Sequence, residues 1–187
     1  MPKEDWEKNN LAKLFNLPKV KSVLDVGCGL SLKSKYIDAD IRVGVDIFEP
    51  YLKAIESEVP YVVIKHDIRD LDSIFIPNSF DLVIACDVIE HLEKEEALQL
   101  IKQCERIAKK AVILETPKGF VPQDLDILGF NAHDLQTHKC GWEPRELEAL
   151  GYTVTVRDYT MSDIKRHSSL DVETHIQLLE AIKWLES

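Results

Sequence analysis

Residues 23–29 read VLDVGCG, an apolar run that ends in two glycines one residue apart. A turn that only reverses the chain needs one glycine. Two glycines indicate a backbone stripped of side chains so that a ligand can lie against it. The stretch therefore predicts a strand, a tight turn, and a ligand-binding crevice at the carboxyl end of that strand.

The rest of the chain alternates short apolar runs, rich in valine and isoleucine, with charged segments of helical character. The runs are SVLDV, IRVGVDI, YVVIKHDI, FDLVIACDVI, KAVILETP and YTVTVRDYT. Nearly continuous apolar strands separated by crossovers are typical of a parallel sheet that is buried on both faces. The sequence therefore predicts an α/β fold with a doubly wound, mostly parallel sheet of six or seven strands and helices on both faces.

A length of 187 residues predicts a single domain. We expect an N-terminal helix within residues 1–19, an α/β core over 20–160 and a C-terminal helix over 171–187. The last expectation rests on apolar residues in steps of three or four, at Val172, Ile176, Leu179, Ile182 and Leu185. Such an apolar face also predicts a homodimer that forms through the C-terminal helix.

Composition narrows the choice of partners and of cell compartment. The net charge of −10 opposes attraction to nucleic acid or to an anionic membrane. No apolar run approaches the roughly 20 residues that span a bilayer, and the charged N-terminus lacks the apolar segment of a secretion signal. Four cysteines without a CxxC pair are expected to be free thiols. These features predict a cytoplasmic protein that acts on a small molecule or on another protein.

Carboxylates end the second and third apolar runs. Asp46 closes RVGVD, where a carboxylate can accept both hydroxyls of a ribose, and Asp67 closes VVIKHD, where it can accept from an exocyclic amine. The isoleucines that follow them can clamp a flat base. The sequence thus predicts an adenosine pocket, formed by Gly27, Cys28, Gly29, Asp46, Ile47, Asp67 and Ile68.

The glycine pattern separates two kinds of adenosine ligand. A dinucleotide site uses G-x-G-x-x-G, and here the third glycine is absent, since Leu30, Ser31 and Leu32 follow Gly29. Asp25, two residues before the first glycine, is poorly placed beside a pyrophosphate but suits a cationic ligand. An NAD-dependent oxidoreductase therefore remains only as a disfavoured alternative.

Taken in order, VLDVGCG, GVDI, HDIRDL and FDLVIACDVIEHL resemble the motifs of class I S-adenosylmethionine-dependent methyltransferases, from about Val20 to Gly151. The resemblance implies a Rossmann-like fold and S-adenosylmethionine as the cofactor. It implies that the methionyl part lies over residues 27–29 with Asp25 near its ammonium group. Cys86 and Asp87 would border the sulfonium, Asp46 would hold the ribose, and Asp67 with Ile68 would hold the adenine.

The sequence departs from the family pattern in two places. Ser31 stands where many members have a third glycine in G-x-G-x-G. Family members also usually end in an antiparallel hairpin, and only YTVTVRDYT reads as one of its two strands. We therefore expect that the sheet can stop at six strands, with the C-terminal helix covering the gap.

Candidate general bases follow the fourth strand. Glu90 and His91 begin at its end, beside the proposed sulfonium, and His133 and His138 lie in the long irregular stretch 117–142. A competing interpretation makes His91 a half-buried residue that packs under the cofactor. The implied function is methyl transfer to a small molecule or an exposed side chain. A non-catalytic S-adenosylmethionine-binding partner subunit is the alternative.

The long stretch 117–142 has the length of a lid or binding loop. It carries residue types that bind metals, namely Asp124, Asp126, His133, Asp134 and His138. Their spacing matches no established ligand signature, so the sequence predicts no metal site.

Overall fold

The predicted apolar runs form strands that join into one sheet. The computed structural model describes residues 11–30, 33–56, 60–124, 126, 128–160 and 175–186. Within these ranges the strands are β1 (Val20–Val26), β2 (Ala39–Asp46), β3 (Val62–Lys65), β4 (Phe80–Cys86), β5 (Ala108–Pro117), β6 (Thr153–Thr160) and β7 (His175–Trp184).

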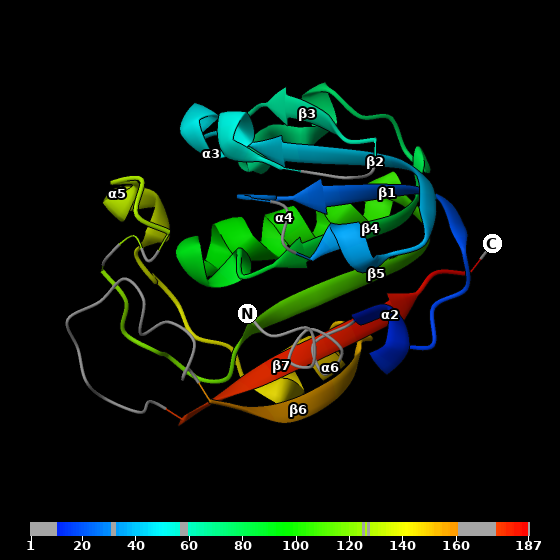
Figure 1. The fold of residues 1–187 in the computed structure, drawn as a ribbon. Coiled ribbons are helices and arrows are strands. Elements are labelled where there is room, and N and C mark those ends of the chain that lie inside the picture. The colour runs from blue at the N-terminus through cyan, green and yellow to red at the C-terminus, as the bar shows by residue number, and fades with distance from the viewer. Residues whose placement is uncertain are drawn as a thin grey trace.

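The sheet has the strand order β3-β2-β1-β4-β5-β7-β6 (Figure 1). Strands β1 to β5 pair in parallel, and β7 runs antiparallel between β5 and β6. The order reverses between β1 and β4, so a crevice opens at the carboxyl ends of these two strands. The glycine turn predicted to bind a ligand follows β1 at this point.

The expected C-terminal helix is wrong. Of residues 171–187, those from His175 to Trp184 form β7, while residues 171–174, with Val172 among them, and Ser187 lie outside the described part of the chain. Residues 178–182 are all buried, because β7 lies between two strands and both its faces are covered. A strand that is apolar on both faces loses its alternating pattern and imitates a helical one. In the described part of the chain the sheet therefore has seven strands, and the predicted homodimer loses the helix on which it rested.

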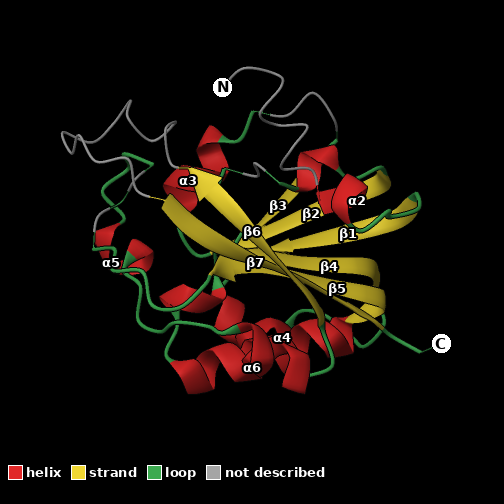
Figure 2. Cartoon of the chain, turned by 90° about the horizontal axis from the view of Figure 1, so that it is seen from below, coloured by secondary structure: helices red, strands yellow, loops and turns green. Residues whose placement is uncertain are grey.

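Helices cover both faces of the sheet (Figure 2). The α-helices are α2 (Leu11–Leu14), α3 (Glu49–Ala54), α4 (Lys94–Ile107), α5 (His133–Gln136) and α6 (Pro144–Ala149), and the short 3-10 helices are η1 (Ser34–Tyr36), η2 (Ile68–Ser73) and η3 (Ile89–His91). Of the N-terminal helix expected within 1–19, the described residues contain α2 alone, and residues 1–10 lie outside them. No helix in the described ranges is long and apolar enough to cross a bilayer.

Successive residues of the central strands face opposite apolar layers. Leu24 packs in the core on the α4 side, whereas Val23 packs in the core that contains Leu11 of α2. Helix α4 is the longest helix of the described chain and begins at a capping box in which Glu93 and Glu96 each bond the other's backbone amide. This cover holds the ends of β1 and β4 in place, and these ends position the site.

Candidate cofactor-binding site

The glycine turn has the backbone conformation that its sequence predicted. Gly27 and Gly29 both have positive φ, +64° and +49°. A Cβ atom on Gly27 would also lie 2.7 Å from Cγ2 of Val88, whereas one on Gly29 would meet only Leu128, at 4.0 Å. Position 27 therefore requires glycine both because its φ is positive and because a side chain would collide with Val88. Position 29 requires glycine only because its φ is positive.

Asp46, at the end of β2, braces this turn. Its Oδ2 accepts a hydrogen bond from the Gly29 amide over 2.9 Å, and its Oδ1 accepts from the Phe48 amide over 2.8 Å. Burial raises the pKa of Asp46, and the amide donors oppose that shift. Each oxygen keeps a further lone pair, so the carboxylate can accept from a ligand without releasing the turn.

Asp67 follows β3 and caps η2 by accepting from the Arg69 amide over 2.9 Å. The Arg69 guanidinium also bonds both carboxylate oxygens, with Nη2 2.6 Å from Oδ2 and Nε 3.0 Å from Oδ1. These bonds are the main reason that the pKa of Asp67 lies below its ordinary value. Arg69 is thus a neighbour of the predicted adenine site that the sequence did not single out.

Asp87 follows β4 in a strained conformation, with φ +54°, and its amide donates to the Glu115 carbonyl over 2.9 Å. A non-glycine residue in this region is uncommon, and such residues cluster at functional sites. Asp87 is exposed and lines the pocket. Burial and the charge of Glu115 raise its pKa to about 6.

One pocket of about 260 Å³ lies where these residues meet. It is lined by Gly27, Asp46, Ile47, Tyr51, Asp67, Ile68, Arg69, Asp87, Val88, His91, Leu92, Asp134, Leu135, Gln136 and Lys139. Six of the ten predicted cofactor residues are among them, from four separate strand ends. The long stretch 117–142 contributes α5 and Lys139, as a binding loop would.

The sequence did not predict the part of the pocket wall that Tyr51 forms. Tyr51 of α3 packs edge-on against Phe48 and Phe130, and its hydroxyl donates to Asp126 over 2.9 Å. These contacts join α3 to the 117–142 loop on one side of the pocket. The aromatic residues just after Asp46 were the available signal, but their partners lie about 80 residues away.

Four predicted cofactor residues do not line the pocket, and their contacts with a cofactor stay predictions: Asp25, Cys28, Gly29 and Cys86. Asp25 is buried behind the turn, where Ser34 Oγ donates to its Oδ2 over 2.5 Å and the Tyr61 hydroxyl over 3.0 Å. Its side chain leaves the sheet on the α2 face, because neighbouring residues of a strand point to opposite faces. Burial raises the pKa of Asp25 to about 6.

The two predicted bases lie at different depths. His91 lines the pocket and is half-buried, and burial, followed by the nearby His138, lowers its pKa to about 4. Glu90 is 2% exposed and lies behind the pocket wall, where Thr116 Oγ1 donates to its Oε2 over 2.9 Å. Burial raises the pKa of Glu90. A base works best with a pKa near the working pH, so neither group is tuned for that role, and both roles stay predictions.

The two loop histidines are also separated. His138 is 9% exposed, and its ring lies edge-on to that of His91 with centroids 4.7 Å apart. His133 is exposed on α5, where its Nδ1 accepts from the Asp126 amide over 3.0 Å. Of the two, only His138 reaches the residues that follow β4.

Comparisons with known proteins agree with this geometry. Residues 24–114 match the sequence model of a family described as a methyltransferase domain. This span contains the glycine turn, Asp46, Asp67 and Asp87. A search of curated protein sequences finds no match.

Solved structures share the fold over nearly the whole chain. An S-adenosylmethionine-dependent methyltransferase from Archaeoglobus fulgidus is 22% identical with a TM-score of 0.61, covering 96% of this chain and 94% of the other. The YcgJ protein from Bacillus subtilis is 13% identical with a TM-score of 0.66, covering 96% and 99%. Magnesium protoporphyrin IX methyltransferase from Synechocystis, solved with bound S-adenosylmethionine, is 20% identical with a TM-score of 0.54, covering 92% and 74%.

The fold expected from the strand pattern is confirmed, and the matched family is the one that the four motifs resemble. Residues 24–114 therefore match a methyltransferase domain, which is consistent with the class I S-adenosylmethionine-dependent methyltransferases that the four motifs resemble and with the enzyme class and cofactor that these motifs predicted.

Proposed function

We propose that the protein binds S-adenosylmethionine in the pocket at the ends of β1, β2 and β4 and transfers its methyl group to a small molecule or to an exposed protein side chain. The observation that carries this proposal is that Asp46 and Gly27 of the glycine turn line the same pocket. A hydrogen bond of 2.9 Å from the Gly29 amide to the Asp46 carboxylate joins the turn to Asp46. A carboxylate can accept hydrogen bonds from the ribose hydroxyls of a ligand, and a turn without side chains lets another part of that ligand lie close to the backbone.

Each wall of the pocket then has a proposed partner on the cofactor. Asp46 accepts from the ribose, and Ile47 and Ile68 lie on the two sides of the adenine, with Asp67 near its amine. Asp87 faces the pocket at the end of β4, where a negative charge favours the positive sulfonium. The strained backbone of Asp87 keeps this carboxylate at the pocket rather than within the sheet.

Methyl transfer from S-adenosylmethionine needs a general base only when the acceptor still carries its proton. The positive sulfur already activates the methyl group, so the protein chiefly has to align an acceptor with the S–CH3 bond. Alignment of this kind can lower a barrier by roughly 7–11 kcal/mol. An acceptor that already lacks its proton, such as an unprotonated amine nitrogen or a thiolate, needs no base, which fits the low pKa of His91.

The alternatives keep less support. A partner-subunit role rested on an exposed C-terminal helix, and His175–Trp184 is a strand. An NAD-dependent activity still lacks the third glycine. Nucleic acid as the acceptor remains disfavoured by the net charge of −10, and the cytoplasmic location stays a prediction.

Calorimetric titration with S-adenosylmethionine, S-adenosylhomocysteine and NADH tests the cofactor. We expect binding of the two sulfur ligands in the micromolar range and none of NADH. Binding should be lost in Asp46→Ala and kept in Asp40→Ala, which changes an exposed aspartate at the other end of β2. The absence of binding for both sulfur ligands would refute the proposal.

The acceptor class needs a second assay. S-adenosylmethionine labelled in its methyl group is offered with either a protein-free small-molecule extract, a protein extract or purified RNA. Label transferred to either of the first two supports the proposal, and label transferred only to RNA contradicts it. The Asp46→Ala variant supplies the background in each case.

A further inference from the structure

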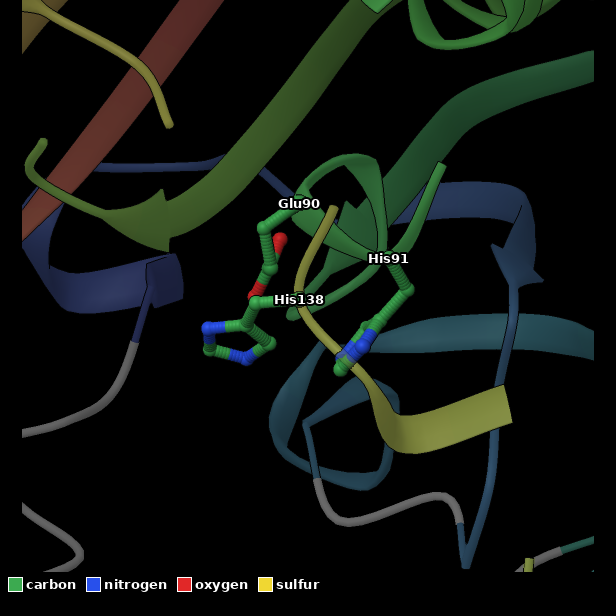
Figure 3. A group of neighbouring side chains, drawn as sticks. All are labelled: Glu90, His91 and His138. Atoms are coloured by element: carbon green, nitrogen blue, oxygen red, sulfur yellow. The ribbon is translucent and has the colours of Figure 1, made fainter. Parts of the chain in front are cut away.

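A group of three metal-ligating side chains lies directly behind the pocket wall. Glu90 and His91 come from η3, and His138 comes from the loop that precedes α6 (Figure 3). One ligand atom from each lies within 4.8 Å of the other two. Glu90 and His138 are 48 positions apart in the sequence, so only the fold brings the three residues together.

One carboxylate oxygen of Glu90 accepts no hydrogen bond from the described residues. The side chain is 2% exposed, and its Oε2 accepts from Thr116 Oγ1, which fixes the orientation of the carboxyl group. Its Oε1 is buried and has no hydrogen-bond partner among the residues that the structure describes. A buried carboxylate oxygen left unpaired is costly, and a bound cation would remove that cost.

The two histidine rings are held so that the same nitrogen of each is available. Nδ1 of His91 lies 3.3 Å from the Thr137 carbonyl, and Nδ1 of His138 lies 2.6 Å from the Val121 carbonyl. A carbonyl oxygen only accepts, so each Nδ1 carries the hydrogen and each Nε2 presents a lone pair. Histidines that bind metals are held in this way, by a second nitrogen that donates to a carbonyl or a carboxylate.

The backbone fixes the loop to η3 without help from a ligand. The amides of Lys139 and Cys140 both donate to the Glu90 carbonyl, over 2.8 and 3.2 Å. His138, the residue before them, is itself held through its amide, which donates to the Gln123 carbonyl over 2.9 Å. The three side chains are therefore preorganised beside one another.

We propose that Glu90, His91 and His138 bind one divalent transition-metal ion, with Zn²⁺ and Mn²⁺ as candidates. Two imidazole nitrogens and one carboxylate oxygen are a ligand set that such ions accept. Ligand atoms about 2.0–2.2 Å from an ion lie roughly 3–3.5 Å apart, so the present spread of up to 4.8 Å contracts on binding.

Three protein ligands leave at least one coordination position open, and His91 places the ion at the pocket wall. This site was not expected from the sequence, which predicted no metal ligands, and it assigns Glu90 and His91 to coordination rather than to proton transfer. The inference does not depend on the methyl acceptor or on cofactor binding.

Metal binding is tested on the full chain after treatment with a chelator. Zn²⁺, Mn²⁺ and Mg²⁺ are titrated separately in competition with a chromophoric chelator, and Co²⁺ is added to record a visible absorption spectrum. We expect one Zn²⁺ or Mn²⁺ per chain, weaker binding of Mg²⁺, and a Co²⁺ spectrum typical of nitrogen ligation. No stoichiometric binding of any transition metal would overturn the proposal.

Variants tie the binding to these residues. Glu90→Gln and His138→Ala should each weaken binding by more than about 100-fold, and Thr116→Val, which removes only the donor to Glu90, by about 10-fold. The control His66→Ala changes a histidine at the end of β3 and should bind as the wild type does. Equal binding by the wild type, Glu90→Gln and Thr116→Val would overturn the proposal, even if His138→Ala fails to fold.

Titration of the same chelator-treated protein with S-adenosylhomocysteine separates this proposal from the proposed function. Protein that binds this ligand but no metal refutes only the metal site. Protein that binds metal at Glu90 but neither sulfur ligand refutes only the proposed function.

Discussion

Asp46, which lines the pocket, is joined to Gly29 by a hydrogen bond of 2.9 Å from the glycine amide to the carboxylate Oδ2. The same carboxylate accepts from the Phe48 amide through its other oxygen. One side chain at the end of β2 thus braces the turn that follows β1 and presents the acceptor proposed for the ribose. Asp46 therefore has both a structural and a ligand-binding role, and we expect its variants to change both the stability of the protein and its affinity for the cofactor.

Asp46→Asn keeps the size of the side chain but retains only one acceptor oxygen for the two amides. We expect a loss of about 1–2 kcal/mol in the free energy of unfolding, measured by urea denaturation. Affinity for S-adenosylmethionine and S-adenosylhomocysteine should fall by the same factor, since both carry the ribose. Asp40→Asn, at the other end of β2, should stay within about 0.5 kcal/mol of the wild type. A variant that weakens only one of the two ligands would contradict the role given to Asp46.

Gly27→Ala should destabilise the protein more than Gly29→Ala. Both substitutions put a side chain on a left-handed backbone, at a cost of about 1–2 kcal/mol. Only the methyl at position 27 also meets Val88, 2.7 Å away. Combined with Val88→Ala, the Gly27→Ala penalty should shrink by roughly 1 kcal/mol or more in a double-mutant cycle. Equal penalties at the two glycines would show that the close approach to Val88 does not matter.

Asp25→Asn should change how stability depends on pH. Burial raises the pKa of this carboxyl to about 6 in the folded protein, from an ordinary value of about 4. Its contribution to stability is therefore complete below pH 4 and is lost as the pH rises through about 6. Asparagine does not titrate, so its contribution to stability does not change with pH. The free energy of unfolding of the variant should therefore rise by up to roughly 3 kcal/mol relative to that of the wild type between pH 4 and 8. Urea unfolding across this range measures the difference, and parallel profiles would contradict it.

Glu180→Gln tests a buried acid pair on the same face of the sheet. Glu180 of β7 lies directly opposite Glu115 of β5, and the two carboxyls form ion pairs with Arg157 and Lys33, respectively. Burial is the main cause that raises the pKa of Glu180 to about 7, with Glu115 adding to it. The stability that comes from the protonated form is present below about pH 4.5 and lost as the pH rises through 7.

The Glu180→Gln variant should therefore become more stable relative to the wild type from pH 5 to about pH 7 and then level off towards pH 9, whatever its stability at a single pH. Thermal unfolding over this range is the measurement. Glu148→Gln, on the exposed part of α6, serves as the control for a change of one charge. A relative stability that stays constant, or that falls with pH, would mean that Glu180 is ionised throughout.

The sequence alone determined the parallel strands, the glycine turn and the carboxylates that end β2, β3 and β4. These features are local, because an apolar run predicts its own strand and a parallel sheet brings its carboxyl ends to one edge. For this reason Asp46, Asp67 and Asp87 line the pocket as their positions predicted. Their order along the chain also carries the resemblance to methyltransferases, and residues 24–114 match a methyltransferase domain.

Tertiary structure alone decided the rest. Whether residues 175–184 form a helix or a strand depended on the gap between β5 and β6, since burial of both faces removed the pattern that distinguishes the two. The burial of Asp25 behind the turn, where the Ser34 hydroxyl donates to its carboxylate, depended on how η1 packs against β1. The meeting of Glu90, His91 and His138 depended on how a long irregular loop returns to η3, and no local pattern encodes a contact between residues 48 positions apart.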